Sequence, residues 1–376
     1  MKITHIEAYD LNIPCDIKYS AAWAPGVSEE FRKFTLVIVR TDEGLSGYGG
    51  GNGHFAARIV KIVKPFLLGE NPFFVEKYIR ILRDIGGVWA IEIALWDIIG
   101  KAANLPLYML WGASRTKIPA YASTCVSGLP GNFDERIQQV KRYYNEGFQA
   151  IKIRLHFDTI EEDLQYVDTV IEAVGGKVDI MVDANQATLM IPSAVKSPRW
   201  DYRRALRTAK ELEKRGVLWL EEPLGRWDFD ELARLRENTE IYIAGGEMNN
   251  ALHDFRLMVE KKSYDIIQPD VVNQSLTEVM KIKGLCETFN IHFVPHHGVS
   301  AIGLAATIHI LCTYDHWTFM EYIYDPPYRT IENYQCLGGI VRTPILVDGT
   351  GSISPPLGPG LGIVIDEGKI KEYKVD

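Results

Sequence analysis

The sequence has few cysteines, and their pattern excludes a disulfide-based scaffold. Five are present among 376 residues, namely Cys15, Cys125, Cys286, Cys312 and Cys336. Their number is odd, and no two of them form a CxxC pair. We interpret them as buried thiols in a reducing compartment, and we therefore expect a cytoplasmic protein.

Long apolar runs and an excess of positive charge are also absent. No apolar run approaches the length that spans a bilayer, and residues 1–7 alternate like a strand and lack the apolar core of a signal peptide. The formal net charge is −8 and the sequence pI is about 5.7. We therefore expect neither a nucleic-acid partner nor a membrane partner.

The chain is long for one domain, and its first part has the pattern of a separate α+β unit over residues 1–115. Strands are predicted at 2–11, 34–41 and 45–49, and helices at 56–68, 74–83 and 88–103. Residues 16–30 show no periodicity and are predicted to be a loop that acts as a lid, with Tyr19 and Trp23 as candidate substrate contacts. The glycine run at 49–53 lacks the lysine spacing of a phosphate loop.

From residue 116 the pattern changes to strand, loop and helix in repetition, up to about residue 325. Strands are predicted at 118–123, 150–155, 180–183, 218–221, 241–245, 266–268, 291–295 and 319–322. This rhythm predicts a (β/α) barrel with its active site at the carboxyl ends of the strands. The long segment 185–202 is predicted to line the barrel mouth. The proline- and glycine-rich tail, 326–376, is predicted to return to the N-terminal unit.

Three successive predicted strands end in acidic residues, Asp183, Glu221 and Glu247. A carboxylate at the end of an apolar run is costly unless a metal or an opposite charge holds it. The set contains only oxygen ligands, which suits Mg²⁺ better than Zn²⁺. Glu222 has the opposite parity and is predicted to be a structural ion-pair partner, while Asn185 is a candidate for orienting a ligand or contacting substrate.

Basic side chains share the inner face of the strand at 150–155. Strand side chains alternate, so if the apolar residues face the outer helices, Lys152, Arg154 and His156 face the barrel interior. They either pair with neighbouring acids or point at an anion bound to the metal, and the second interpretation is preferred.

The next strands end in a candidate base and its partner. Asp270 and His296 can form a dyad in which the carboxylate fixes the imidazole tautomer and raises the imidazole pKa. His296 has the inward parity of Val294, so it is preferred to His297. Glu321 ends the last strand and, if protonated, could donate to an enolic oxygen.

These motifs resemble those of the enolase superfamily, and within it the mandelate racemase subgroup. The resemblance rests on Lys152-Ile153-Arg154, Asp183 in DxN, Glu221 in EEP, Glu247 in GE, Asp270 after QP, and His296 after proline. It implies a modified (β/α)7β TIM-like barrel, capped by an α+β domain built from both termini. It also implies a Mg²⁺-dependent enzyme that removes the proton α to a carboxylate, with Asp183, Glu221 and Glu247 as metal ligands, His296 and Asp270 as the base dyad, and Glu321 serving the enediolate.

Arg154 departs from the family's KxK pattern, whose second lysine is the opposite-face base of the racemase. A guanidinium stays protonated and is a poor base, so we expect β-elimination of water from an acid sugar to a 2-keto-3-deoxy acid, an acid-sugar dehydratase (hydro-lyase) reaction. The alternative is a racemase or epimerase of α-substituted carboxylates that uses Lys152 or His156 as second base. A metal-dependent hydrolase and a non-catalytic binding barrel fit less well. The partner is a small-molecule carboxylate, and we expect a homo-oligomer between a dimer and an octamer.

Overall fold

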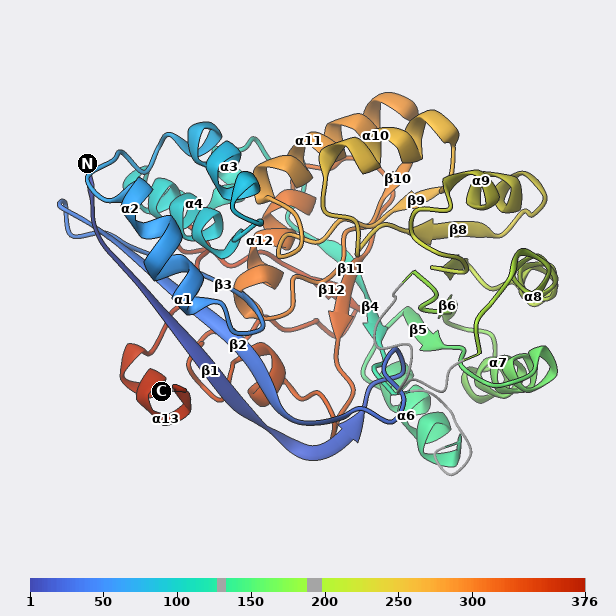
Figure 1. Cartoon of the computed structure of the whole chain (residues 1–376). Helices are drawn as coiled ribbons and strands as arrows, with labels where there is room; N and C mark the ends of the chain where they lie inside the picture. The colour runs from blue at the N-terminus through green and yellow to red at the C-terminus, as the bar shows by residue number, and fades with distance from the viewer. Residues whose placement is uncertain (127–132, 188–197, 376) are drawn as a thin grey trace.

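The computed structural model describes residues 1–126, 133–187 and 198–375 (Figure 1). A three-stranded antiparallel sheet opens the chain, with β1 at Ile3–Ser20, β2 at Ser28–Thr41 and β3 at Ser46–Asn52. The expectation of a loop over 16–30 is wrong, because most of that segment extends the β1–β2 hairpin, where Tyr19 pairs with Glu29 and Ser20 with Ser28. This arm leaves the body of the sheet and reaches the barrel near α6. The end of the arm packs on the barrel in a small apolar cluster of Tyr19 and Ala21 with Cys125 and Val126.

Short helices cover the sheet and complete the capping domain. They are α1 (Ala56–Arg58), η1 (Ile59–Val63), α2 (Lys64–Leu67), α3 (Val75–Asp84), α4 (Ala90–Ala102) and α5 (Leu107–Leu110). Their apolar faces form a core with Ile3, Ile6, Val37 and Val39 of the sheet. The N-terminal end of α4 thereby lies at the edge of the cavity described below.

The second part of the chain is the predicted barrel. Its strands are β4 (Ile118–Ser123), β5 (Ala150–Arg154), β6 (Asp179–Asp183), β7 (Trp219–Glu221), β8 (Tyr242–Gly245), β9 (Ile266–Ile267), β10 (His292–Phe293) and β11 (Met320–Ile323). Between them lie α6 (Phe133–Asn145), α7 (Ile160–Val174), α8 (Tyr202–Lys214), α9 (Phe229–Glu237), α10 (Leu252–Lys261), α11 (Leu276–Phe289) and α12 (Ala301–Leu311). The strands are parallel in the order β10-β9-β8-β7-β6-β5-β4-β11. The Thr318 hydroxyl donates to the Phe293 carbonyl at 2.7 Å and so links the two ends of this order.

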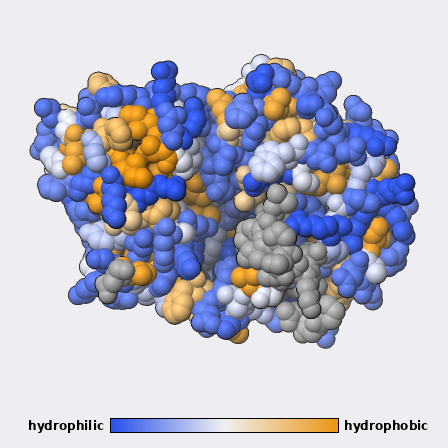
Figure 2. Space-filling view, viewed as in Figure 1, coloured by the Kyte–Doolittle hydropathy of each residue, from blue (hydrophilic) through white to orange (hydrophobic). Residues whose placement is uncertain are grey.

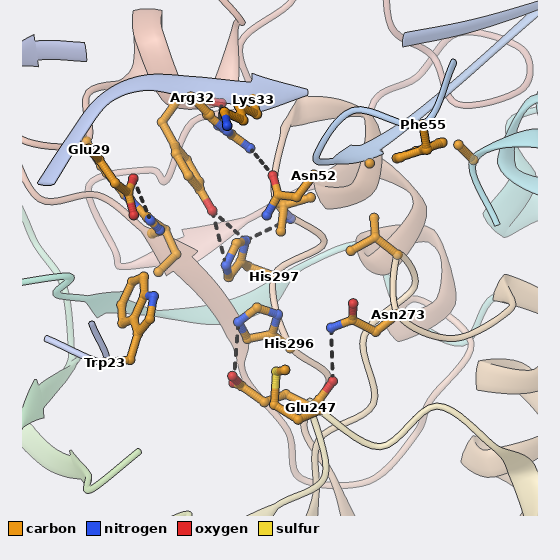
Figure 3. A pocket seen from close by; sticks show the side chains of 18 of the residues that line it. Trp23, Glu29, Arg32, Lys33, Asn52, Phe55, Glu247, Asn273, His296 and His297 are labelled. Carbon is orange, nitrogen blue, oxygen red and sulfur yellow. Dashed lines mark hydrogen bonds and ion pairs between the residues drawn. The ribbon is translucent and has the colours of Figure 1, made fainter. Parts of the chain in front are cut away.

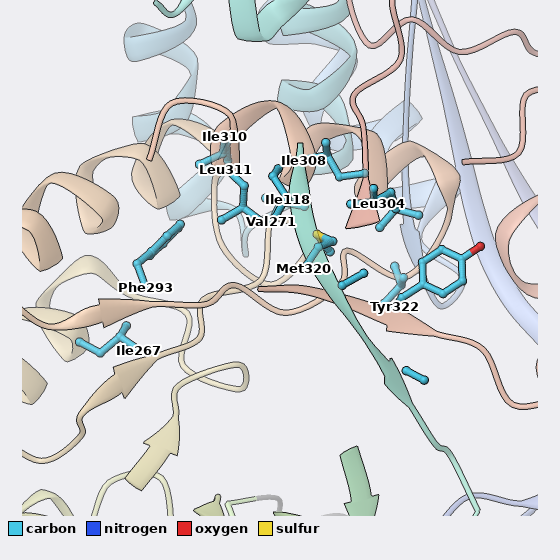
Figure 4. Packing of buried hydrophobic residues seen from close by; sticks show 14 of the residues in the cluster. Ile118, Ile267, Val271, Phe293, Leu304, Ile308, Ile310, Leu311, Met320 and Tyr322 are labelled. Atoms are coloured by element: carbon cyan, nitrogen blue, oxygen red, sulfur yellow. The ribbon is translucent and has the colours of Figure 1, made fainter. Parts of the chain in front are cut away.

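The strands carry two apolar layers, as their alternation requires. Residues such as Ile151, Ile153 and Leu155 pack outward into one large core with the helices. Figure 4 shows this packing between α12 and the strands β4 and β11, where Ile308 and Leu311 lie near Ile118 and Met320. The inner layer is separate and includes Tyr121, Met181, Trp219 and Val294. The outward parity predicted for the Ile151 set is confirmed.

The C-terminal segment belongs to both parts. Its elements are η2 (Ile331–Gln335), β12 (Ser352–Ile353), η3 (Glu367–Lys369) and α13 (Ile370–Tyr373). The strand β12 pairs antiparallel with β4 of the barrel. Beyond it the chain returns to the capping domain, where Lys374 bridges to Leu11 and Glu367 forms an ion pair with Arg40 at 2.6 Å. This return agrees with the predicted course of the tail.

The surface carries an apolar groove over the capping helices. Figure 2 shows apolar side chains gathered near α3 and α4, and the groove there has a volume of about 720 Å³ and is lined by Phe73, Phe74, Trp96, Trp111 and Met280 among others. None of the helices in the described ranges has the length and apolarity needed to cross a membrane.

Candidate active site

A cavity of about 840 Å³ lies at the carboxyl ends of the barrel strands. Its barrel side includes Arg154, Asn185, Glu247 and His296, and its other side comes from the β1–β2 arm, the start of α4 and the C-terminal segment. Figure 3 shows His296 and Glu247 facing Arg32 and Lys33 across it. The site is therefore shared between the two parts of the fold.

The three predicted metal ligands lie on neighbouring strand ends. Asp183 of β6 and Glu221 of β7 are partners in the parallel register, and both side chains are fully buried. Glu247 follows β8 through Gly246, whose φ of +116° favours glycine. Burial raises the pKa of each carboxyl, to about 6 for Glu221, and the charges of neighbouring acids add to this effect.

Lys152 and Arg154 project from β5 onto these carboxylates, as their parity predicted. Lys152 Nζ lies 2.5 Å from Glu221 Oε1 and 2.9 Å from Glu321 Oε1. Arg154 Nη1 forms an ion pair with Asp183, and its Nε donates to the Thr124 carbonyl at 2.8 Å. Burial alone would lower the pKa of both cations, but the surrounding carboxylates outweigh it and raise their pKa values. Both side chains are thus fixed cations.

The donor set at these strand ends fits a divalent cation. Within the described ranges, no three Asp, Glu, His or Cys side chains are arranged as a metal-binding group, and Lys152 and Arg154 hold two of the acids instead. The carboxylates of Asp183, Glu221, Glu222 and Glu247 are nevertheless close enough to raise one another's pKa. A hard cation with oxygen ligands would compensate this accumulated negative charge.

The ion pair expected for Glu222 is not found. The residue has a positive φ of +46°, and neither of its buried carboxylate oxygens has a hydrogen-bond partner among the residues that the structure describes. Burial raises the pKa of Glu222 well above its usual range, and the charges of Glu247 and Asp183 add to this. Parity failed here because the chain leaves the strand in a left-handed conformation directly after Glu221.

The predicted dyad is present. His296 Nδ1 forms a hydrogen bond with Asp270 Oδ2, and Asp270 is held in turn by the Val272 amide at 2.7 Å. The other ring nitrogen, Nε2, lies 3.4 Å from Glu247 Oε2 and 3.7 Å from Glu321 Oε2. Burial lowers the pKa of His296, but Glu247, Glu321 and Asp270 outweigh it and raise that pKa to about 10. The structure pairs His296, and not His297, with Asp270.

His297 has different partners and a different charge state. Its Nδ1 accepts from the Val299 amide at 2.8 Å, and its Nε2 lies 3.2 Å from the Tyr334 hydroxyl. Burial lowers the pKa of His297 well below its usual range, and the charge of His296 adds to this. This ring is therefore neutral, and it lines the cavity in contact with His296, with the two ring centroids 4.0 Å apart.

Glu321 lies opposite the dyad as an anion. Its Oε1 accepts from the Ser123 hydroxyl at 2.7 Å, while Oε2 is buried without a hydrogen-bond partner in the described part of the chain. Burial would raise the pKa of Glu321, but Lys152 and His296 outweigh it and hold that pKa well below its usual range. The protonated form considered from sequence is thus disfavoured in this arrangement, and Oε2 is suited to accept a hydrogen bond.

The four predicted substrate contacts divide into two groups. Trp23 and Asn185 line the cavity. His156 lies behind Asn185, with Nε2 3.1 Å from its Oδ1, and burial lowers the pKa of His156 to about 4. Tyr19 borders a smaller neighbouring cavity of about 310 Å³ and contacts Arg329. Part of the predicted mouth insertion, 188–197, lies outside the described residues.

Sequence reasoning missed the cationic side of the cavity. Arg32 lies between the predicted loop, 16–30, and the predicted strand, 34–41, and Arg329 lies within the predicted tail. The position of Arg329 shortly after the last barrel strand was the one available signal, since barrel sites gather at strand ends. Nothing in the sequence indicated Arg32, because its neighbours in the fold come from segments far along the chain.

Comparisons with known proteins agree with this architecture. Residues 25–112 match the model for the mandelate racemase / muconate lactonizing enzyme N-terminal domain, and residues 135–369 match the enolase C-terminal domain-like model. Arabinonate dehydratase of Saccharolobus solfataricus is 29% identical over 93% of this chain and 92% of its own. D-galactarolactone cycloisomerase of Agrobacterium fabrum is 27% identical over 100% and 99%. The crystal structure of a racemase from Streptomyces coelicolor with bound magnesium has a TM-score of 0.84 and 26% identity, covering 99% of this chain and 100% of that one.

Proposed function

The chain belongs to the enolase superfamily, in its mandelate racemase subgroup, and we propose that it is a Mg²⁺-dependent acid-sugar dehydratase. The observation that carries this proposal is the single-base geometry of the cavity, in which one dyad, His296 with Asp270, faces the candidate metal ligand Glu247. An arabinonate dehydratase among the relatives and bound magnesium in a structural neighbour support it.

The three acids would hold Mg²⁺, which would supply positive charge to the substrate carboxylate as the α-proton leaves. His296 Nε2 is the side of the imidazole that faces the cavity, because Asp270 holds Nδ1. A cation held by Glu247 would offset the carboxylate charge that raises the pKa of His296, which leaves the imidazole neutral and able to act as a base. Nε2 then takes the proton from the α-carbon and gives a proton to the departing β-hydroxyl, which leaves as water. The enol that results tautomerises to the 2-keto-3-deoxy acid, so that one base is sufficient for the whole reaction.

The opposite face of the cavity offers no comparable base. Lys152 and Arg154 are held as cations by Glu221, Glu321 and Asp183, so neither can accept a proton at neutral pH. Two groups would be needed to exchange a proton between the two faces of the α-carbon. This arrangement favours dehydration over racemisation or epimerisation, which stays the alternative.

The test follows the fate of the α-proton and of the β-hydroxyl. The enzyme is incubated with Mg²⁺ and a panel of acid sugars in D₂O, and the products are followed by NMR. We expect 2-keto-3-deoxy acid to form without accumulation of the α-epimer. Appearance of the epimer without loss of water would show that Lys152 or His156 acts as a second base. An isomer formed without loss of water and without epimerisation would indicate a cycloisomerase. No reaction with any acid sugar would overturn the proposal.

Two further properties belong to this proposal. The five cysteines are free thiols, four of them buried, which supports a reducing cytoplasmic location. We also predict that the protein forms a homo-oligomer between a dimer and an octamer. Light scattering after size-exclusion chromatography tests this directly. A stable monomer at micromolar concentration would contradict it.

A further inference from the structure

The side of the cavity opposite the dyad contains two buried arginines from distant segments. Arg32 comes from β2 and Arg329 from the C-terminal segment, and their residues are 8% and 9% exposed. Both line the cavity together with His296 (Figure 3, where Arg32 is labelled). Burying a guanidinium is costly unless an opposite charge or a full set of hydrogen bonds compensates it.

Arg32 has no acidic partner within ion-pair distance in the described part of the chain. Its Nη1 donates to the Tyr334 carbonyl, its Nη2 lies 3.4 Å from Asn52 Oδ1, and its Cζ lies 3.7 Å from the centroid of the Tyr334 ring. All of these partners are neutral. Burial lowers the pKa of Arg32 to about 10, which leaves the group charged at neutral pH.

Arg329 has one weak acidic partner. Its Nε donates to the Tyr19 hydroxyl at 2.8 Å, and Nη2 lies 3.7 Å from Glu29 Oε2. Glu29 is the only carboxylate within ion-pair distance of either arginine in the described ranges. It also accepts from the Tyr19 hydroxyl at 2.9 Å. The other acid on this side, Glu30, is already paired with Lys18. Two more basic residues, Lys33 and Arg58, line the cavity. The far side thus carries uncompensated positive charge.

The distance between the two ends of the cavity suits a small molecule. Trp23 lies between the two ends, with its ring centroid 5.2 Å from the Arg154 Cζ and 4.9 Å from the Arg329 Cζ. The guanidinium beside the metal ligands and the one on the far side therefore contact the same indole. A ligand of sugar length with one end at Glu247 and Arg154 would therefore extend past Trp23 to the side of the cavity that Arg329 and Arg32 line.

We propose that Arg32 and Arg329 bind a second anionic group at the distal end of the substrate, a carboxylate or a phosphate. The inference rests on the proposed function, because it takes the first carboxylate to lie at the metal. The substrate class is then the dianionic acid sugars, and a sugar monoacid, which presents a neutral hydroxyl at that end, leaves the two buried cations without a counter-charge.

Matched pairs of substrates test the proposal. Each hexaric acid is compared with the hexonic acid of the same configuration, galactarate with galactonate and glucarate with gluconate, and 6-phosphogluconate is the phosphate arm. We expect at least one dianion to exceed its matched monoacid by about 100-fold or more in kcat/KM. The dianion with the higher kcat/KM, a hexaric acid or 6-phosphogluconate, shows whether the distal anion is a carboxylate or a phosphate. Matched pairs that differ by less than about 3-fold in every configuration would overturn the inference.

Variants separate binding from folding. Arg32→Gln and Arg329→Gln should raise KM for the dianion by about 10–100-fold and raise KM for a monoacid by a much smaller factor, while Arg32→Lys should restore part of the loss. Arg40→Gln is the matched control, because Arg40 lies on the same strand but pairs with Glu7 and Glu367 outside the cavity. An unchanged KM for the dianion in soluble Arg32→Gln and Arg329→Gln would contradict the assignment. If these variants do not fold, the matched pairs with the unmodified enzyme decide.

The same experiment distinguishes failure of the inference from failure of the proposed function. Dehydration of monoacids and dianions with equal efficiency would leave the function in place and remove the distal anion site. Absence of both α-proton exchange and dehydration with every acid would instead remove the function, together with the substrate assignment that depends on it.

Discussion

His296 and His297 are neighbours in sequence, but their side chains have different partners and different charges. His296 contacts Asp270 and lies near Glu247, whereas His297 contacts the Val299 amide and the Tyr334 hydroxyl. One ring is therefore poised to exchange a proton with the cavity, and the other is neutral. Both residues follow β10 in the loop after Phe293, and their ring centroids lie 4.0 Å apart, so the contact with Asp270 and not the side of a strand decides which of them is the base.

The dyad gives the first residue-scale prediction. His296→Asn should reduce dehydration and α-proton exchange by more than about 10²–10⁴-fold, because the same imidazole serves as base and then as acid. Asp270→Asn should also lose most activity, since the imidazole loses the carboxylate that fixes its tautomer and raises its pKa. His297→Asn should have a mild effect. Product formation and exchange of the α-proton in D₂O are the measurements.

Metal binding is the control for these variants. Each should still bind Mg²⁺, as measured by calorimetry, because Asp183, Glu221 and Glu247 are unchanged. Full activity in His296→Asn together with an inactive His297→Asn would show that the base has been assigned to the wrong ring.

At the scale of elements, the barrel strands could be predicted because each combines a short apolar run with a polar residue at its carboxyl end. Asp183 and Glu221 are the last residues of their strands and Asp270 lies three residues after β9, so the sequence indicated both the fold and most of the candidate site. The β1–β2 arm could not be predicted, because it extends beyond its own sheet and is stabilised by contacts with the barrel. Arg32 and Tyr334, which are 302 positions apart, meet only through that arm.

The packing of β3 on α4 gives a prediction at this scale. A Cβ at Gly49 would lie 1.8 Å from the Ala90 carbonyl oxygen, so Gly49→Ala must push α4 away from the sheet. We expect a destabilisation of at least about 1–3 kcal/mol, seen as a lower apparent Tm, and a higher KM because Trp89 and Ala90 line the cavity. Gly225→Ala, with no atom within 4 Å of the added Cβ, is the control and should leave both unchanged.

At the scale of the whole molecule, the accumulated charge of the site should make stability depend on pH and on metal. Burial raises the pKa of Glu221 from 4.5 to about 6, and those of Asp183 and Glu247 move in the same direction. A carboxyl whose pKa is higher in the folded than in the unfolded protein stabilises the fold fully below its unfolded-state pKa. This stabilisation is lost as the pH rises through its folded-state pKa. For Glu221 the loss between pH 4.5 and 7 is about 2 kcal/mol in metal-free protein. Mg²⁺ should restore stability at neutral pH, by about 2.7 kcal/mol at 100 times its Kd.

Thermal unfolding at pH 5 and pH 7, with EDTA or with Mg²⁺, measures both effects. The metal-dependent increase in Tm should be larger at pH 7, because the ligands must lose their protons before they bind the cation. Glu221→Gln removes one titrating ligand, so its metal-free Tm should fall less between the two pH values, and Mg²⁺ should stabilise it less. Glu237→Gln changes an exposed acid on α9 and should behave like the unmodified protein. Equal stabilisation of Glu221→Gln and of the unmodified protein by Mg²⁺ would show that the cation binds elsewhere, and the proposed metal site would then be wrong.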